Sequence, residues 1–249
     1  MITLNIPHAS LFIPKDIKFS LSEKDLEKEA ILMSDTYVEQ LFDKHNYIDV
    51  IQADVSRIVV DTERFIDDTI ETAAKYGMGV IYVKTHDGKD LRNTPTKNEK
   101  INLLNQFYFP HHNKLNKSVN NNLDNYDKAV IIDLHSYSSN VDILGIGNKN
   151  TPDICIGFDK FHYNQNIANI IVYFCKKNNF SYEFNIPFSG SIVPMQYYKK
   201  NEKVVSFMLE IKKSLYMDED TFEKNNNFNN LKQKINTLLN DIYTKFYGE

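Results

Sequence analysis

Short apolar runs alternate with longer amphipathic stretches along this chain. The apolar runs predict β-strands at Ile2–Ile6, Tyr47–Gln52, Gly79–Lys84, Ala129–Leu134, Ile154–Gly157 and Val204–Leu209. Several of these runs are apolar at every position, as expected for parallel strands that are covered by helices on both faces. The pattern therefore predicts a largely parallel sheet.

Apolar residues at helical spacing predict helices between these strands. We expect them over Ser34 to about His45 (with Ser34 as the N-cap), Lys97 to about Asn120, His162–Lys177, and the C-terminal stretch from Leu231 to Phe246. The alternation indicates an α/β fold with a mostly parallel or mixed central sheet flanked by helices. Because no linker or repeat interrupts it, we expect a single domain spanning residues 1–249. Ligands of such sheets bind beyond the carboxyl ends of the strands.

Composition and charge exclude several classes of protein. A hydrophobic content of 42% over 249 residues is sufficient for a core, and a net charge of -4 leaves no basic excess for nucleic acid. Cys155 and Cys175 form no CxxC pair, so we expect small core residues in a reducing cytoplasm. The first residues are too short and strand-like for a signal peptide, and no apolar run could span a membrane. We expect a cytoplasmic protein without membrane or nucleic-acid partners.

Two histidines follow predicted strands in equivalent positions. His8 lies two residues beyond Ile6, after the stiffening Pro7, and His135 directly follows Leu134. A single loop histidine is usually no ligand, but two at strand ends favour a metal site, since imidazole is the commonest metal-binding side chain. Asp133 shares the face of His135 on an extended strand, so it could orient one of the histidines or form a salt bridge.

A zinc site needs about three protein ligands, so a further ligand is expected. Asp35 is the preferred candidate, because Val38 and Phe42 follow it at helical spacing and place it on a buried stripe. The alternative is that Asp35 only stabilises the first turn of a helix. Glu39 is the second candidate ligand.

Glu210 is the candidate general base. The buried run that begins at Val204 ends in this carboxylate, and a glutamate there is costly unless it is paired or used. Beside a metal it could take the proton of a bound water. The alternative is a salt bridge to Lys212 or Arg64.

Arg57 and Arg64 flank the apolar run Ile58–Val60 and are candidate anchors for an anionic substrate, because a guanidinium fork matches a carboxylate. The alternative is internal pairing of Arg57 with Asp54 and of Arg64 with Asp61.

His112 lies on a helical stripe with Tyr108 and Leu115, and Pro110 is expected to kink or restart that helix. His112 is either a hydrogen-bonded core histidine or a substrate-binding or proton-relay residue. Ser189 and Gly190 could line a pocket through their backbone amides, although GxSxG, Walker and GxGxxG motifs are absent.

With these residues in place, the chain resembles the N-formylglutamate amidohydrolase family, a relative of the zinc carboxypeptidases. The resemblance runs from Pro7 to about Tyr216. It rests on the order of short segments: Pro7-His8-Ala9-Ser10, Ser34-Asp35-Thr36, Ser56-Arg57 with Asp61 and Arg64, Tyr108 to Leu115, Asp133-Leu134-His135-Ser136, Pro187-Phe188-Ser189-Gly190, and Leu209-Glu210-Ile211 with Leu215-Tyr216-Met217.

The resemblance implies a zinc-exopeptidase-like α/β fold and metal-dependent hydrolysis of an N-acyl, in particular an N-formyl, acidic amino acid such as N-formylglutamate. It maps the metal ligands onto His8 and His135 and the catalytic carboxylate onto Glu210. Two positions depart from the carboxypeptidase pattern: Leu11 stands where an acidic ligand is expected, so that Asp35 is the replacement, and Glu63 stands where an asparagine precedes the arginine. The alternatives are a zinc carboxypeptidase, another N-acyl amino acid deacylase, or a silent ligand-binding member of the fold.

Overall fold

The computed structural model describes residues 1–139 and 151–248. These residues form two compact units. The first, which we call the sheet unit, consists of Met1–Ile6, Tyr37–Ile51 and Leu115–Glu249. The second, which we call the insert unit, consists of Pro7–Thr36 and Gln52–Lys114. The insert unit is thus built from the two stretches of chain that follow the first two strands, and the expectation of one domain over the whole chain stays a prediction.

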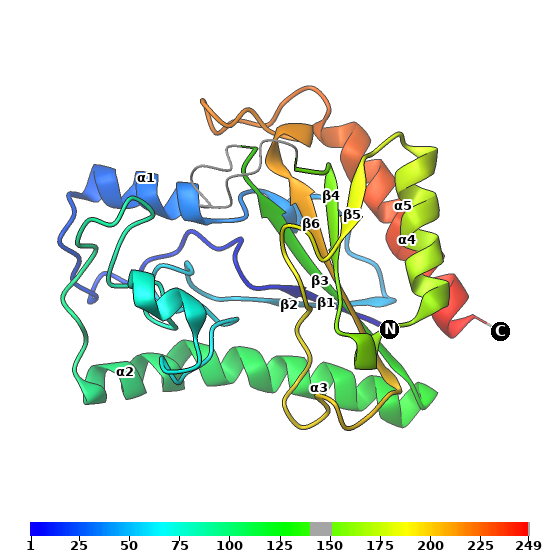
Figure 1. Cartoon of the computed structure of the whole chain (residues 1–249), viewed down its shortest axis with the longest axis horizontal. Helices are drawn as coiled ribbons and strands as arrows, with labels where there is room; N and C mark the ends of the chain where they lie inside the picture. The colour runs from blue at the N-terminus through cyan, green and yellow to red at the C-terminus, as the bar shows by residue number, and fades with distance from the viewer. Residues whose placement is uncertain (140–150, 249) are drawn as a thin grey trace. The chain divides into compact units, whose positions relative to one another are not determined.

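The sheet unit contains a six-stranded sheet with the strand order β2-β1-β3-β6-β4-β5 (Figure 1). Strands β1, β3 and β6 are parallel neighbours, β4 is antiparallel to β6, and β5 is parallel to β4. This mixed sheet confirms the predicted α/β fold. The strands are β1 (Ile2–Ile6), β2 (Ile48–Gln52), β3 (Ala129–Tyr137), β4 (Ile154–Gly157), β5 (Tyr182–Phe184) and β6 (Val204–Lys212).

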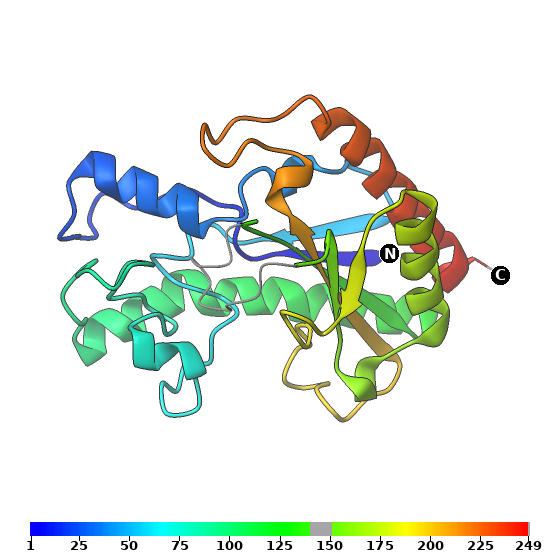
Figure 2. The same cartoon turned by 45° about the horizontal axis from the view of Figure 1, so that its top comes forward.

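Helices pack against the sheet, and the core of this unit lies between the helices and the strands. Helices α4 (Gln165–Lys177) and α5 (Phe228–Tyr247) pack on each other along one side of the sheet, and α3 (Phe109–Tyr126) runs along the other side (Figures 1 and 2). Val119 of α3 packs against Ala129 and Ile131 of β3 and Val204 of β6. Burial of aliphatic side chains of this kind contributes roughly 1.5–3 kcal/mol each.

The insert unit has helices α1 (Glu23–Met33) and α2 (Lys97–Leu103) and much irregular backbone. The side chain of Ser22 caps α1, and Thr96 and Glu99 form a capping box at α2. Its core is made of aliphatic and aromatic side chains in two clusters: Val55, Val59, Val60, Val80, Ile81, Leu104 and Phe107, and Ala30, Ile58, Tyr82 and Leu91.

The helical region predicted from Lys97 extends through α2, a π-helical turn at Leu104–Tyr108 and α3. The π turn ends two residues before Pro110, and the amide of Phe109, which stands between them, donates to the carbonyl of Leu104. Proline lacks an amide hydrogen and crowds the preceding turn, so the predicted irregularity at Pro110 takes the form of this bulge.

Two predicted elements are wrong. The helix expected from Ser34 to His45 is absent: Ser34 is the C-cap of α1, and only a 3₁₀ turn at Val38–Gln40 follows. The Ser34 hydroxyl donates back to the Ile31 carbonyl and contacts the Thr36 hydroxyl, and such local bonds compete with a helix. The strand expected at Gly79–Lys84 is absent: the segment makes only two isolated bridges, Met78 with Tyr82 and Lys84 with Asp90, and its apolar residues Val80 and Ile81 are buried in the core of the insert unit.

Other expectations are confirmed or extended. Cys155 and Cys175 are buried free thiols. Strands β3 and β6 extend beyond the predicted limits and include His135 and Glu210. Helix α1 and the short edge strand β5 were not predicted. Within the described residues, no helix combines the length and apolarity that crossing a lipid bilayer requires.

Candidate functional site

One face of the sheet unit changes from apolar to polar along its strands. Ala129 and Ile131 face α3, and the period-two alternation of a strand places Asp133 and His135 on the same face further along β3. His135 is the direct partner of Glu210 in the β3–β6 pairing. Directly paired residues point to the same face, so the predicted ligand and the predicted base are neighbours.

Asp133 connects three elements of this face. Its carboxylate accepts hydrogen bonds from the Asn5 side chain (2.8 Å) and the Ile192 amide (3.2 Å). Its Oδ1 lies 3.0 Å from His135 Nε2. All of these groups belong to the sheet unit. The contact with His135 is the basis of the prediction that Asp133 positions a histidine.

The loop that carries Ser189 and Gly190 lies against the same strands. The Gly190 amide donates to Asn185 Oδ1, and the neighbouring Ser191 hydroxyl contacts the Ser206 hydroxyl of β6 at 2.5 Å. Gly190 has a φ of +85°, a conformation that favours glycine. Ser189 itself is exposed. A role of these two residues in substrate binding stays a prediction.

In the insert unit, His8 lies beside Asp35. The amide of Asp35 donates to the carbonyl of His8 (2.9 Å), and His8 Nδ1 lies 3.6 Å from Asp35 Oδ2. Both residues are buried. The burial expected of Asp35 is confirmed, although it lies in the irregular segment after α1 and not in a helix. Glu39, the other candidate ligand, accepts a hydrogen bond from the Gln40 side chain.

Asp61 is the centre of the polar cluster in the insert unit. Its Oδ1 lies 2.9 Å from His8 Nε2 and 3.0 Å from the Glu63 amide. Its Oδ2 accepts from Arg57 Nε (3.2 Å), Arg57 Nη2 (2.9 Å) and the Tyr82 hydroxyl (2.8 Å). The contact with Asp61 fixes the orientation of the His8 ring, so that Nε2 faces Asp61 and Nδ1 faces Asp35.

The charges of this cluster shift its ionisation equilibria. Burial raises the pKa of Asp61, but His8, Arg57 and Arg64 outweigh burial and hold the pKa well below its usual range. Burial and Arg57 lower the pKa of His8, and the Asp61 and Asp35 carboxylates raise it by more. Burial, together with the Asp61 carboxylate, raises the pKa of Tyr82 to about 12. Tyr82 therefore acts as a hydrogen-bond donor at neutral pH.

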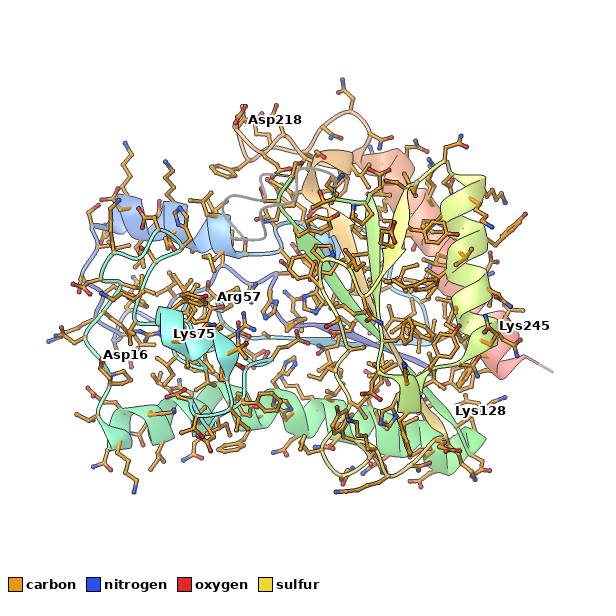
Figure 3. All side chains as sticks on the ribbon, in the orientation of Figure 1. Asp16, Arg57, Lys75, Lys128, Asp218 and Lys245 are labelled. Carbon is orange, nitrogen blue, oxygen red and sulfur yellow. The ribbon has the colours of Figure 1, made fainter. Side chains whose placement is uncertain are left out.

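The two predicted anchor arginines differ in their surroundings. The guanidinium of Arg57, labelled in Figure 3, is held by Asp61 and contacts the Met33 carbonyl, and its side chain is only 15% exposed. Arg64 lies 3.6 Å from Asp61 with its side chain 32% exposed. The internal pairing considered for Arg64 is therefore present, whereas Arg57 pairs with Asp61 and not with Asp54, which pairs with Lys114.

His112 and Tyr108 hold the backbone that carries Arg64. His112 Nε2 donates to the Thr62 carbonyl (2.8 Å), the Tyr108 hydroxyl donates to the Arg64 carbonyl (3.1 Å), and the two rings lie 4.3 Å apart. His112 is thus hydrogen-bonded, as the first of its two interpretations expects. A direct contact of His112 with substrate stays a prediction.

The sequence did not reveal three contributors to this cluster: Tyr82, Glu71 and Arg92. Buried Arg92 donates to the carbonyls of Tyr82, Ile58 and Val59, and burial lowers its pKa to about 10. Only Tyr82 carried a signal in the sequence, because its hydroxyl lies within the apolar run Gly79–Val83 and a buried hydroxyl there needs a hydrogen-bond partner.

Comparison with known proteins agrees with this arrangement. The family model described as N-formylglutamate amidohydrolase matches residues 2–217. The N-formylglutamate deformylase of Pseudomonas putida is 25% identical over 223 residues, which are 87% of this chain and 81% of that protein.

Two solved structures share the fold. The N-formylglutamate amidohydrolase from Ralstonia eutropha JMP134 superposes with a TM-score of 0.88 at 20% identity, covering 99% of this chain and 93% of that one. A gene product of Agrobacterium tumefaciens superposes with a TM-score of 0.69 at 17% identity, covering 98% and 89%. Because the family model covers residues 2–217, the chain belongs to the N-formylglutamate amidohydrolase family and is an enzyme of the amidohydrolase class.

Proposed function

We propose that this protein is a zinc-dependent amidohydrolase that cleaves an N-acyl acidic amino acid such as N-formylglutamate, releasing formate and the free amino acid. The observation that carries the proposal is the pairing of His8 with Asp35. The 3.6 Å between Nδ1 and Oδ2 exceeds a hydrogen bond, but it suits two ligands of one tetrahedral ion, whose bonds are about 2.0–2.2 Å long. Imidazole nitrogen and carboxylate oxygen are also the donors that zinc accepts.

His135 is the proposed third ligand. Strands β1 and β3 are parallel neighbours in which Asn5 pairs with Asp133. His8 follows Asn5 by three residues and His135 follows Asp133 by two, so the register of the two strands supports a common ion. A bound zinc ion would supply a Lewis acid and lower the pKa of its water to about 7.

Glu210 is the proposed general base. Its carboxylate accepts a proton from the attacking water, the water oxygen bonds to the acyl carbon, and the carbon–nitrogen bond breaks. Glu210 then delivers the proton to the leaving amine. Its support is the pairing with His135, which places the base beside a proposed ligand on one face of the sheet.

Arg64 is the proposed anchor for a substrate carboxylate. Its guanidinium is more exposed than that of Arg57, and its two carboxylate neighbours lie at 3.6 and 3.9 Å, beyond hydrogen-bond reach. Its donors can therefore engage a ligand, whereas those of Arg57 are used by Asp61 and Met33. Arg57 supplies positive potential from a fixed position, and His112, Ser189 and Gly190 are the further proposed contacts.

The test replaces Glu210 with glutamine and measures zinc content together with turnover of N-formylglutamate. We expect Glu210→Gln to lower kcat by about 10²–10⁴-fold, the usual contribution of general acid–base catalysis, with zinc content near that of the wild type. Wild-type turnover in Glu210→Gln would exclude this residue as the base.

A substrate panel separates the proposed reaction from its neighbours. N-formylglutamate, other N-acyl amino acids and short peptides are compared by kcat/KM. Preference for a peptide with a free C-terminus would indicate a carboxypeptidase instead. A protein that takes up no zinc and cleaves none of these compounds would be a ligand-binding member of the fold. A cytoplasmic location, predicted from the two free cysteines, belongs to the same proposal.

A further inference from the structure

Arg64 lies between two carboxylates without a hydrogen bond to either. Its Nε is 3.6 Å from Asp61 Oδ2, and its Nη1 is 3.9 Å from Glu71 Oε1. Within the described part of the chain, Arg64 Nε has no hydrogen-bond partner. The two carboxylates therefore act on this guanidinium mainly through their charge.

The carboxylate of Glu71 is fixed by other groups. Oε1 accepts from the Ala73 amide (2.9 Å), where it caps the 3₁₀ turn Thr72–Tyr76, and Oε2 accepts from the Phe65 amide (3.0 Å). Its side chain is 5% exposed. Each oxygen is thus occupied by a backbone donor, and the carboxylate is not available to turn toward Arg64.

Asp61 and Glu71 differ in what else they do. Asp61 also holds His8, Arg57 and Tyr82, so its negative charge is shared among several donors. Glu71 has Arg64 as its only cationic partner among the ion pairs of the described residues. Its charge can therefore act selectively on Arg64.

We infer that Glu71 is a specificity-tuning residue, a fixed counter-charge that weakens the hold of Arg64 on a substrate carboxylate. This inference rests on the proposed function. An anion that approaches Arg64 meets both the attraction of the guanidinium and the repulsion of Glu71, and at separations near 4 Å in a partly buried site neither is negligible. Hydrolysis leaves the carboxylate on the free amino acid, so the same counter-charge favours release of this product.

A merely structural role predicts the opposite outcome. If Glu71 served only to cap the turn and hold Phe65, its replacement would loosen the segment that carries Arg64 and weaken anion binding. A counter-charge predicts that removal of the charge strengthens anion binding. The sign of the change therefore separates the two roles.

The experiment measures glutarate binding to the zinc-loaded protein by calorimetry, and KM and kcat for N-formylglutamate. We expect Glu71→Gln to bind glutarate about two- to fivefold more tightly, in the range of one partly exposed ion pair, and to lower KM similarly with little change in kcat. A substrate analogue whose carboxylates are carboxamides should show no shift.

Two matched variants complete the test. Glu71→Asp keeps the charge and should stay closer to the wild type than Glu71→Gln. Glu29→Gln alters another buried carboxylate of the insert unit, which binds the amide and ring of His86, and should leave glutarate affinity unchanged.

Unchanged or weaker glutarate binding by Glu71→Gln would overturn the inference, and so would an equal shift for the carboxamide analogue. Because glutarate binding requires no turnover, tighter binding by Glu71→Gln supports the inference even if N-formylglutamate is not cleaved. Cleavage without a Glu71 effect would leave the proposed function intact and remove only the inference.

Discussion

At the scale of single residues, Asp61 organises the polar cluster of the insert unit. It accepts from His8, Arg57, Tyr82 and the Glu63 amide, so both carboxylate oxygens act only as acceptors. Because Asp61 accepts a hydrogen bond from His8 Nε2–H, the lone pair of the neutral His8 ring is on Nδ1, which faces Asp35. A carboxylate that fixes the tautomer of a ligand histidine raises metal affinity.

Asp61→Asn should therefore weaken zinc binding. A carboxamide has one oxygen, and Arg57 and Tyr82 compete for it, so its NH₂ group would face His8 Nε2 and shift the ring proton to Nδ1. We expect about a 10–100-fold loss of zinc affinity, measured by competition with a chelating dye. ¹⁵N NMR of the zinc-loaded protein reports which ring nitrogen of His8 carries the proton.

Tyr82→Phe is the control, because it removes one donor to Asp61 and keeps the carboxylate. It should retain the tautomer of His8 and most of the zinc affinity. Wild-type affinity in Asp61→Asn, with the proton still on Nε2, would refute the positioning role of Asp61.

At the scale of elements, helix α3 holds the turn that presents Arg64. Its residue His112 donates to the carbonyl of Thr62, and Tyr108, in the preceding π turn, donates to the carbonyl of Arg64. The backbone amides inside a helix already donate to carbonyls of the same helix, so only side chains of the helix can donate hydrogen bonds to the turn. The orientation of the turn thus depends on the helix register.

His112 links this attachment to pH. Burial lowers the pKa of His112 from its ordinary 6.5, and the hydrogen bond to Thr62 opposes the shift only in part. The folded pKa lies below the unfolded one, so below about pH 6.5 the unfolded chain binds a proton that the folded protein does not. The contribution of His112 to the free energy of unfolding is therefore complete above pH 6.5 and declines as the pH falls below it.

Urea unfolding of the wild type and of His112→Gln between about pH 8 and pH 5 measures this contribution. The unfolding free energy of the wild type should fall more steeply at the acidic end. His8, whose pKa is raised, contributes with the opposite sign but is present in both proteins and cancels. Parallel curves would contradict the prediction.

At the scale of the whole molecule, zinc should stabilise the fold by mass action. A ligand at 100 times its dissociation constant adds about 2.7 kcal/mol to the free energy of unfolding. For a chain of 249 residues this corresponds to roughly 5–10 °C in the thermal midpoint. Differential scanning calorimetry with zinc and with a chelator measures the difference.

Two variants identify the carboxylate ligand in the same measurement. Asp35→Asn should lose most of the zinc-dependent shift, because Asp35 Oδ2 lies 3.6 Å from His8 Nδ1. Glu39→Gln should keep the shift, because the Glu39 carboxylate accepts from the Gln40 side chain. The reverse result would make Glu39 the ligand. If the wild type had the same thermal midpoint with zinc as with chelator, the result would contradict the metal site.

The sequence by itself determined most of the sheet and several members of the candidate site. Continuous apolar runs predicted β1, β3, β4 and β6, because strands buried on both faces must be apolar throughout. The same runs drew attention to His8, His135 and Glu210, since a polar residue at the end of a buried strand requires a partner. The sequence also predicted a buried Asp35, although for the wrong reason, because the expected helix there is absent.

Only the tertiary structure decided which polar side chains form hydrogen bonds and ion pairs with one another. The partners of Asp61 come from segments separated along the chain, and the choice of Asp61 over Asp54 by Arg57 depends on the path of the backbone between them. The run at Gly79–Lys84 is apolar whether or not a partner strand exists, so periodicity could not exclude a strand. Hydrophobic patterning records which positions are buried, whereas hydrogen-bond partners and strand neighbours are set by contacts between distant segments.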